Sequence, residues 1–158
     1  LNYSIQNLNE SGMKTSFLKS QWYNKNRRMI YSSLWAYASL NYLYADLVQF
    51  MDKNEHLHYH TGTVNGFEMT PGFIAGSVAF MQIAIANVFL SHAIKNERTL
   101  RWVQIASGAI MTIVQSATLF IGEPTPYYAV LSGCEIAATV YITFDAIKWK
   151  PKRTSGEN

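Results

Sequence analysis

The sequence predicts an all-α protein, an antiparallel four-helix bundle embedded in a membrane. Of its 158 residues, 49% are hydrophobic and only 15% are charged, whereas an average soluble protein carries roughly 25% charged residues. The few charges lie mostly outside four apolar segments of 22 to 24 residues. A helix needs about 20 apolar residues to cross a bilayer. The last three segments are joined by short connections, which favour antiparallel neighbours.

The chain begins with a polar, basic segment, residues 1–28, which has no apolar stretch of the length found in a signal peptide. The first predicted span covers residues 29–51 and holds one charge, Asp46. A long polar loop, residues 52–70, follows it. The second predicted span, residues 71–94, contains no Asp, Glu, Lys or Arg.

The third predicted span, residues 100–121, has Arg101 at its start as its only charge. A turn rich in Gly and Pro then leads into the fourth, residues 126–147. This last span carries two acidic residues, Glu135 and Asp145. The membrane domain is thus predicted to cover residues 29–150, and residues 151–158 are predicted to be a disordered tail.

The distribution of Lys and Arg predicts the orientation of the chain. All 13 of these residues except Lys53 fall before the first span, between the second and third spans or at the start of the third, or just after the fourth. In a four-span protein these regions lie on the same side, and basic residues concentrate on the cytoplasmic side. We therefore expect both termini in the cytoplasm of a bacterial cell and the spans in its inner membrane.

Small and polar residues recur every three or four positions within each span, which predicts faces buried between helices. The predicted inward positions are Ser32, Ser39 and Asp46; Ala75, Ala79, Gln82 and Ala86; Gln104, Gly108, Met111, Gln115 and Thr118; and Ser132, Glu135 and Thr139.

Five polar residues from all four spans are predicted to share one layer in the outer half of the bundle: Asp46, Glu135, Gln115, Gln82 and Asn41. At 1.5 Å per residue they lie roughly 8–15 Å from the outer helix ends. Ionisable residues at membrane depth are costly, so a site for a cation, a proton or a polar head group is one interpretation. A purely structural hydrogen-bond network is the other.

The loop contains three alternating histidines, His56, His58 and His60, which would share one face of an extended segment. Three imidazoles can hold a metal ion such as zinc. A solvated polar loop that gains charge in acidic surroundings is the alternative. Apart from this candidate, the sequence predicts no cofactor.

Several classes of function have no support in the sequence. The only cysteine, Cys134, excludes an intrachain disulfide framework. No nucleophile elbow, phosphate-binding loop, zinc-protease motif or dinucleotide-binding motif is present. The basic end of the bundle suits anionic lipid head groups better than nucleic acid.

The motif Ser33-Leu34-Trp35 and the later Tyr42-Leu43-Tyr44-Ala45-Asp46 resemble those of a family of small bacterial four-span membrane proteins of unknown function. Further points of resemblance are Arg101-Trp102, Ile105, Glu135 and Lys148-Trp149-Lys150. The resemblance covers roughly residues 29–150. It implies that Asp46 and Glu135 occupy polar positions of that family, and it implies no activity. A weaker likeness, in architecture alone, exists to sterol-isomerase and sigma-2-type proteins, four-helix membrane proteins whose acidic residues surround a lipophilic amine or sterol.

Three functional hypotheses follow. The first is a binding or transport module for a small ligand, a cation or protons, for which transport through so few helices would require a homodimer. The second is a non-catalytic structural or accessory subunit of a larger membrane complex. The third is a membrane enzyme that acts on a lipid-like substrate, and it ranks last because the sequence offers no nucleophile.

Overall fold

The computed structural model describes residues 2–53, 60, 62–64, 67–120 and 125–151. Four long helices dominate them: α1 (Asn2–Met51), α3 (Pro71–Ala93), α4 (Glu97–Leu119) and α5 (Pro126–Lys148). A hairpin of two-residue strands, β1 (Thr63–Val64) and β2 (Phe67–Glu68), pairs Thr63 with Glu68 and Val64 with Phe67. The predicted all-α class and its four helices are confirmed.

The helix boundaries follow from local chemistry. Thr70 accepts a hydrogen bond from the amide of Phe73 and precedes Pro71, whose ring suits the first position of α3. Asn96 Oδ1 accepts from the amides of Arg98 and Thr99 and so caps α4. Pro126 opens α5 in the same way as Pro71 opens α3.

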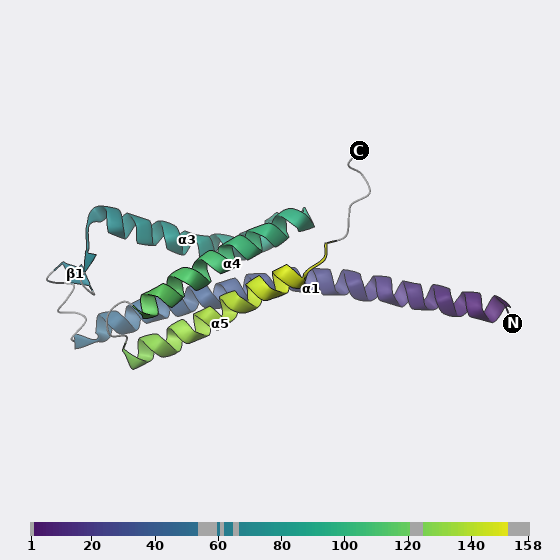
Figure 1. Cartoon of the computed structure of the whole chain (residues 1–158), viewed down its shortest axis with the longest axis horizontal. Coiled ribbons are helices and arrows are strands. Elements are labelled where there is room, and N and C mark those ends of the chain that lie inside the picture. The colour runs from purple at the N-terminus through teal and green to yellow at the C-terminus, as the bar shows by residue number, and fades with distance from the viewer. Residues whose placement is uncertain (1, 54–59, 61, 65–66, 121–124, 152–158) are drawn as a thin grey trace.

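Helix α1 is much longer than its predicted span. Its 50 residues extend over about 75 Å at 1.5 Å per residue, more than twice the thickness of a bilayer core. The N-terminal part projects away from the other three helices (Figure 1). The polar N-terminal segment, from Asn2 on, and the predicted span of residues 29–51 therefore share one continuous helix. Leu1 and residues 152–158, the predicted tail, lie outside the described residues.

The helices pack as a ring with one weak side. α1 packs against α3 and α5, and α4 packs against α5, whereas α3 touches α4 only lightly. In Figure 1, α3 diverges from the other helices towards its N-terminus. All nine residues from Pro71 to Ala79 are exposed, and the buried residues of α3 lie in its second half.

Three helices are long and apolar enough to cross a membrane: α3, α4 and α5. Large apolar side chains such as Phe89, Ile113 and Val130 stay exposed on their outer faces. These features indicate a membrane protein. α1 is not among the three, because tyrosines, serines and Asn41 lower the hydropathy of residues 29–51.

The faces predicted for α4 and α5 are confirmed, whereas the stripe predicted for α1 lies at the edge of the buried side and most of the stripe predicted for α3 is exposed. Ser32 of α1 still donates a hydrogen bond to the carbonyl oxygen of Val88 on α3. Gln104, Gly108, Met111 and Gln115 are buried on α4, as are Ser132, Glu135 and Thr139 on α5. On α1 the buried side is instead aromatic and alanine-rich: Tyr31, Trp35, Ala38, Tyr42 and Ala45. On α3 it consists of Ala84, Asn87 and Ser91.

Candidate functional site

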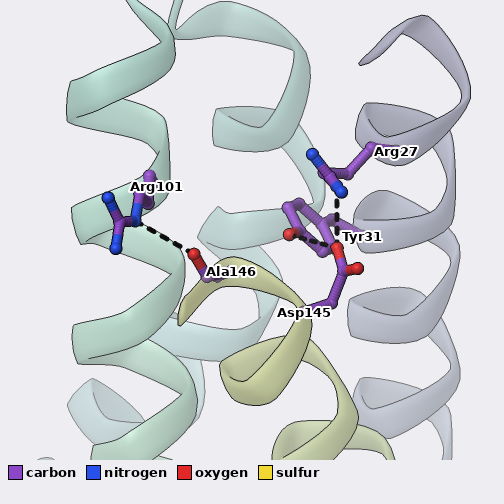
Figure 2. Close-up of polar contacts among 5 residues, drawn as sticks. All are labelled: Arg27, Tyr31, Arg101, Asp145 and Ala146. Atoms are coloured by element: carbon purple, nitrogen blue, oxygen red, sulfur yellow. Dashed lines mark hydrogen bonds and ion pairs between the residues drawn. The ribbon is translucent and has the colours of Figure 1, made fainter. Parts of the chain in front are cut away.

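One end of the bundle is held by an ion pair between α1 and α5. Arg27 Nε donates a hydrogen bond to Asp145 Oδ2 at 2.8 Å, and the Tyr31 hydroxyl donates to the same oxygen at 2.7 Å (Figure 2). The Arg27 guanidinium also lies 4.9 Å from the centre of the Trp149 ring. Both charged side chains are largely buried, so these contacts fix the register of α1 against α5.

Two further arginines bind the carbonyl ends of helices at this same end. Arg28 donates to the carbonyl oxygens of Ile94 and Lys95, just after α3. Arg101 Nε donates to the carbonyl oxygen of Ala146 at 3.0 Å (Figure 2). Its Nη2 donates to the carbonyl oxygen of Ile147 at 3.1 Å. Cations stabilise helix C-termini because the unpaired carbonyls there carry partial negative charge. The basic residues at this end thus serve as structural clamps.

A second polar level joins α1, α3 and α4 around the fully buried amide of Gln104. Its Oε1 accepts from Trp35 Nε1 at 2.6 Å, and its Nε2 donates to Asn87 Oδ1 and Ser91 Oγ. Asn87 Nδ2 in turn donates to Ser107 Oγ at 3.0 Å. The donors and acceptors of Gln104 have partners, so this level is a structural network. The prediction missed the roles of Trp35 and Asn87, although an indole N–H opposite a buried amide is a recognisable signal.

The third level lies between α4 and α5. Thr112 donates to Thr139 Oγ1 at 2.8 Å, and Gln115 Nε2 donates to Ser132 Oγ at 2.9 Å. Gly108 permits the close approach, because a Cβ there would collide with Thr143 Oγ1. These contacts place the inner face of α5, with Glu135, firmly inside the bundle.

Glu135 is the one carboxyl in the described interior that lacks partners. Its residue is 1% exposed, and neither Oε atom has a hydrogen-bond partner among the described residues. An isolated charge in a low-dielectric interior costs far more free energy than a folded protein tolerates. A proton on the carboxyl, a bound cation or ordered water would each relieve this cost.

Tyr42 and Asp46 of α1 interact electrostatically with this carboxyl. The Tyr42 hydroxyl is buried and has no hydrogen-bond partner in the described part of the chain. Glu135 lies within electrostatic reach of both the Tyr42 hydroxyl and the Asp46 carboxylate. Tyr42 and Asp46 also line a cavity of about 140 Å³ between α1 and α3, with Ser39, Leu43, Met81 and Ile85. Such a volume has room for several water molecules.

The five predicted site residues are thus only partly brought together. Glu135 and Gln115 are buried, and Asp46 lies at the lining of the cavity although much of it is exposed. Asn41 is half-buried and donates to the carbonyl oxygen of Tyr37 in its own helix. Gln82 is exposed on α3. The last two side chains belong to faces that turned out to point away from the interior.

The proposed histidine cluster falls mostly outside the described residues. His56 and His58 lie there, and His60 is exposed. No group of His, Cys, Asp or Glu suited to a metal ion occurs among the residues that the structure does describe.

Chemically, the arrangement separates two kinds of buried polar group. The Arg27–Asp145 pair and the Gln104 network have partners and hold helices together. The Glu135 carboxyl and the Tyr42 hydroxyl do not have partners among the described residues, and Tyr42 lines the cavity. Only the second group offers unused donors and acceptors to a ligand.

Comparison with curated proteins and with solved structures gives no match. Comparison with protein families matches residues 18–155 to a family of unknown function, DUF6326. The match covers most of the chain, including the four long helices apart from the first turns of α1. The chain therefore belongs to this family of unknown function.

Proposed function

We propose that this is a multi-pass protein of the bacterial inner membrane that binds a proton or a small cation at Glu135. The cation is a monovalent ion or the ammonium group of a lipophilic amine. The observation that carries the proposal is the buried Glu135 carboxyl with both oxygens lacking a hydrogen-bond partner among the described residues. Ionisable groups inside a membrane otherwise pair with one another or with backbone carbonyls.

The cavity supplies a route to this carboxyl. Asp46 at its lining would attract a cation from outside, and Tyr42, which also lines the cavity, lies in electrostatic reach of Glu135. Rotation of the Tyr42 ring would then admit the cation, or a water carrying a proton, to the carboxyl. Asp46, Tyr42 and Glu135 are the binding residues in this scheme.

The proposal places both termini in the cytoplasm. It requires α1 to cross the membrane together with α3, α4 and α5. At one end of the bundle, Arg27 binds Asp145 on α5. Arg28 binds the carbonyl of Ile94, just after α3, and Arg101 binds the carbonyl of Ile147, near the end of α5. These contacts bring together, at one end of the bundle, the basic residues that precede the first span, separate the second from the third, and follow the fourth. The positive-inside rule assigns such a basic end to the cytoplasm. In a Cys134→Ser background, an impermeant thiol reagent added to intact cells should label Lys53→Cys and spare Lys150→Cys. The reverse pattern would contradict the orientation.

Infrared spectroscopy of the purified protein tests the binding site. A buried protonated carboxyl gives its own C=O stretching band. We expect this band in the wild type, its loss in Glu135→Gln, and its decrease when sodium, potassium or a lipophilic amine is added. The matched control is Glu68→Gln, the same change at an exposed carboxyl in the hairpin, which should leave the band intact.

The stability of Glu135→Gln separates a site from a structural role. A neutral amide costs less to bury than a carboxylate, so a binding site predicts a variant that folds at least as stably as the wild type and no longer responds to cations. A variant that unfolds in mild detergent would favour the structural interpretation. A wild type whose spectrum and stability ignore every cation and pH change would end the proposal.

A second candidate function, that of a non-catalytic subunit, rests on the exposed half of α3. Gln82 and the residues from Pro71 to Ala79 are exposed, and lipid offers a glutamine amide no hydrogen-bond partner. An amide is both donor and acceptor, so two copies related by a two-fold axis would satisfy each other through Gln82. The occupant of this face is then a second copy of the chain. Gln82→Leu should convert a dimer in detergent to a monomer, and a wild type that is monomeric would refute it.

A further inference from the structure

The basic end of the bundle contains a second cavity, remote from Glu135. It measures about 440 Å³ and is lined by Arg98, Arg101, Trp102, Lys150 and Pro151. Three of these five residues are cationic and none is acidic. Glu97 precedes Arg98 in the first turn of α4 but is not part of the lining. The cavity is therefore chemically suited to an anion.

Arg101 is held in place before any ligand arrives. Its Nε donates to the carbonyl oxygen of Ala146 (Figure 2), and its Nη2 donates to that of Ile147, both at the end of α5. A guanidinium has five N–H donors in a fixed plane, so these two bonds orient the remaining ones. A preorganised cation loses little side-chain entropy on binding, which favours affinity.

The other lining groups are mobile cations and one aromatic ring. Arg98 and Lys150 are exposed, so their side chains can close over an anion from two different helix ends. Trp102 is 65% exposed and lies one helical turn after Arg98, on the same side of α4. Exposed tryptophans are typical of the level at which lipid head groups meet the acyl chains.

We propose that this cavity binds the phosphate group of an anionic phospholipid. Arg98, Arg101 and Lys150 contact the phosphate, and the Trp102 ring packs beside the glycerol and the upper acyl chain. The Trp102 ring would have no role in binding a free phosphate ion. Its presence therefore favours a phospholipid over inorganic phosphate as the ligand. The inference requires the helices to lie in a membrane and is independent of Glu135, so either proposal can fail while the other stands.

The test uses two double variants that remove the same charge from the same end of the molecule. Arg98→Gln with Lys150→Gln empties the cavity of its mobile cations and leaves the Arg101 clamp intact. Lys95→Gln with Lys148→Gln removes two exposed lysines that do not line the cavity. Native mass spectrometry of detergent-solubilised protein titrated with phosphatidylglycerol measures the affinity, with phosphatidylcholine and inorganic phosphate as the comparison ligands.

We expect the cavity variant to bind phosphatidylglycerol at least about tenfold more weakly than wild type, from the loss of two surface cations, and the control variant to bind it nearly as wild type does. Phosphatidylcholine should bind weakly to all three proteins. Equal losses in both variants would mean diffuse attraction to the basic surface and overturn the proposal. Inorganic phosphate that displaces the lipid at similar concentration would overturn the lipid as the source. Thermal unfolding of lipid-free variants near the wild-type midpoint confirms that both fold.

Discussion

Replacing Gly108 by alanine should separate α4 from α5 and destabilise the bundle. The new methyl would collide with Thr143 Oγ1 and lie 3.2 Å from the carbonyl oxygen of Thr139. Overpacking of this kind costs about 1–3 kcal/mol. Alanine in a helix recovers about 0.5–1 kcal/mol relative to glycine, so we expect a net loss between about 0 and 2.5 kcal/mol.

Gly133 on α5 provides the matched control, because a methyl there would meet nothing within 4 Å. Gly133→Ala carries the same gain in helix propensity without the collision. The difference in unfolding free energy between the two variants therefore isolates the overpacking cost of about 1–3 kcal/mol. By thermal unfolding in detergent, each kcal/mol corresponds to a shift of about 2–4 °C for a chain of this size.

Thr143→Ala offers a rescue, because it removes the hydroxyl oxygen that the new methyl would strike. The double variant Gly108→Ala with Thr143→Ala should be more stable than the sum of the two single changes predicts, with a coupling of about 0.5–2 kcal/mol. The Thr139 carbonyl remains, so the rescue should be partial. If Gly108→Ala matches Gly133→Ala in stability, or if the two changes simply add, the close contact between α4 and α5 is not as described.

Three further changes probe the polar groups, all by unfolding in detergent. Gln104→Leu should cost about 1–3 kcal/mol, because it leaves the Trp35 indole N–H without its buried acceptor, and a variant as stable as the wild type would contradict this. Arg27→Met should cost about 3–5 kcal/mol by leaving the Asp145 carboxylate largely buried and without its cation, and adding Asp145→Leu should restore part of that loss. Tyr42→Phe should leave stability unchanged or raise it by up to about 1–3 kcal/mol, because it removes a buried hydroxyl that has no partner in the described structure, and a clear loss would reveal a partner.

The sequence predicted where the helices lie better than which way they face. All three of the later helices begin and end within three residues of the predicted spans, because runs without charge and the proline and asparagine caps mark those ends directly. On α4 and α5 the facing stripes are also correct. There the polar residues of one helix form hydrogen bonds with those of the other, as Gln115 does with Ser132.

On α1 the rule of small and polar residues inward fails because aromatic residues compete for the same interface. Tyr31 and Trp35 fill more space than serines, and their polar atoms reach Asp145 and Gln104 across the bundle. Ser39 meanwhile satisfies its hydroxyl on the carbonyl of Trp35 in its own helix and gains nothing from facing inward. Periodicity alone cannot rank these two stripes, since they differ by one residue in register.

On α3 the predicted stripe fails for a different reason, which bears on function. Burial there is decided by Asn87 and Ser91, which meet Gln104 from α4, and the first half of the helix has little to pack against within this chain. Prediction of the inward face assumed that all four helices touch along their whole length.

The burial of Glu135 is predicted from its spacing, but its lack of hydrogen-bond partners among the described residues is not, and that lack distinguishes it from Gln104 and Asp145. Gln104 and Asp145 are equally unusual inside a bundle, yet each has donors directed at it from other helices. A protein that needed Glu135 only for packing would do better with glutamine or leucine, since an unpaired buried carboxyl costs stability in every state except the one with its proton or cation bound. Retaining the acid therefore makes the folded state responsive to that ligand: the tighter a cation binds at Glu135, the more it stabilises the bundle. Gln104 and Asp145 tie the helices of the bundle together, and α3, which packs against α1 but touches α4 only lightly, is the element that we expect to shift if the carboxyl takes up a ligand.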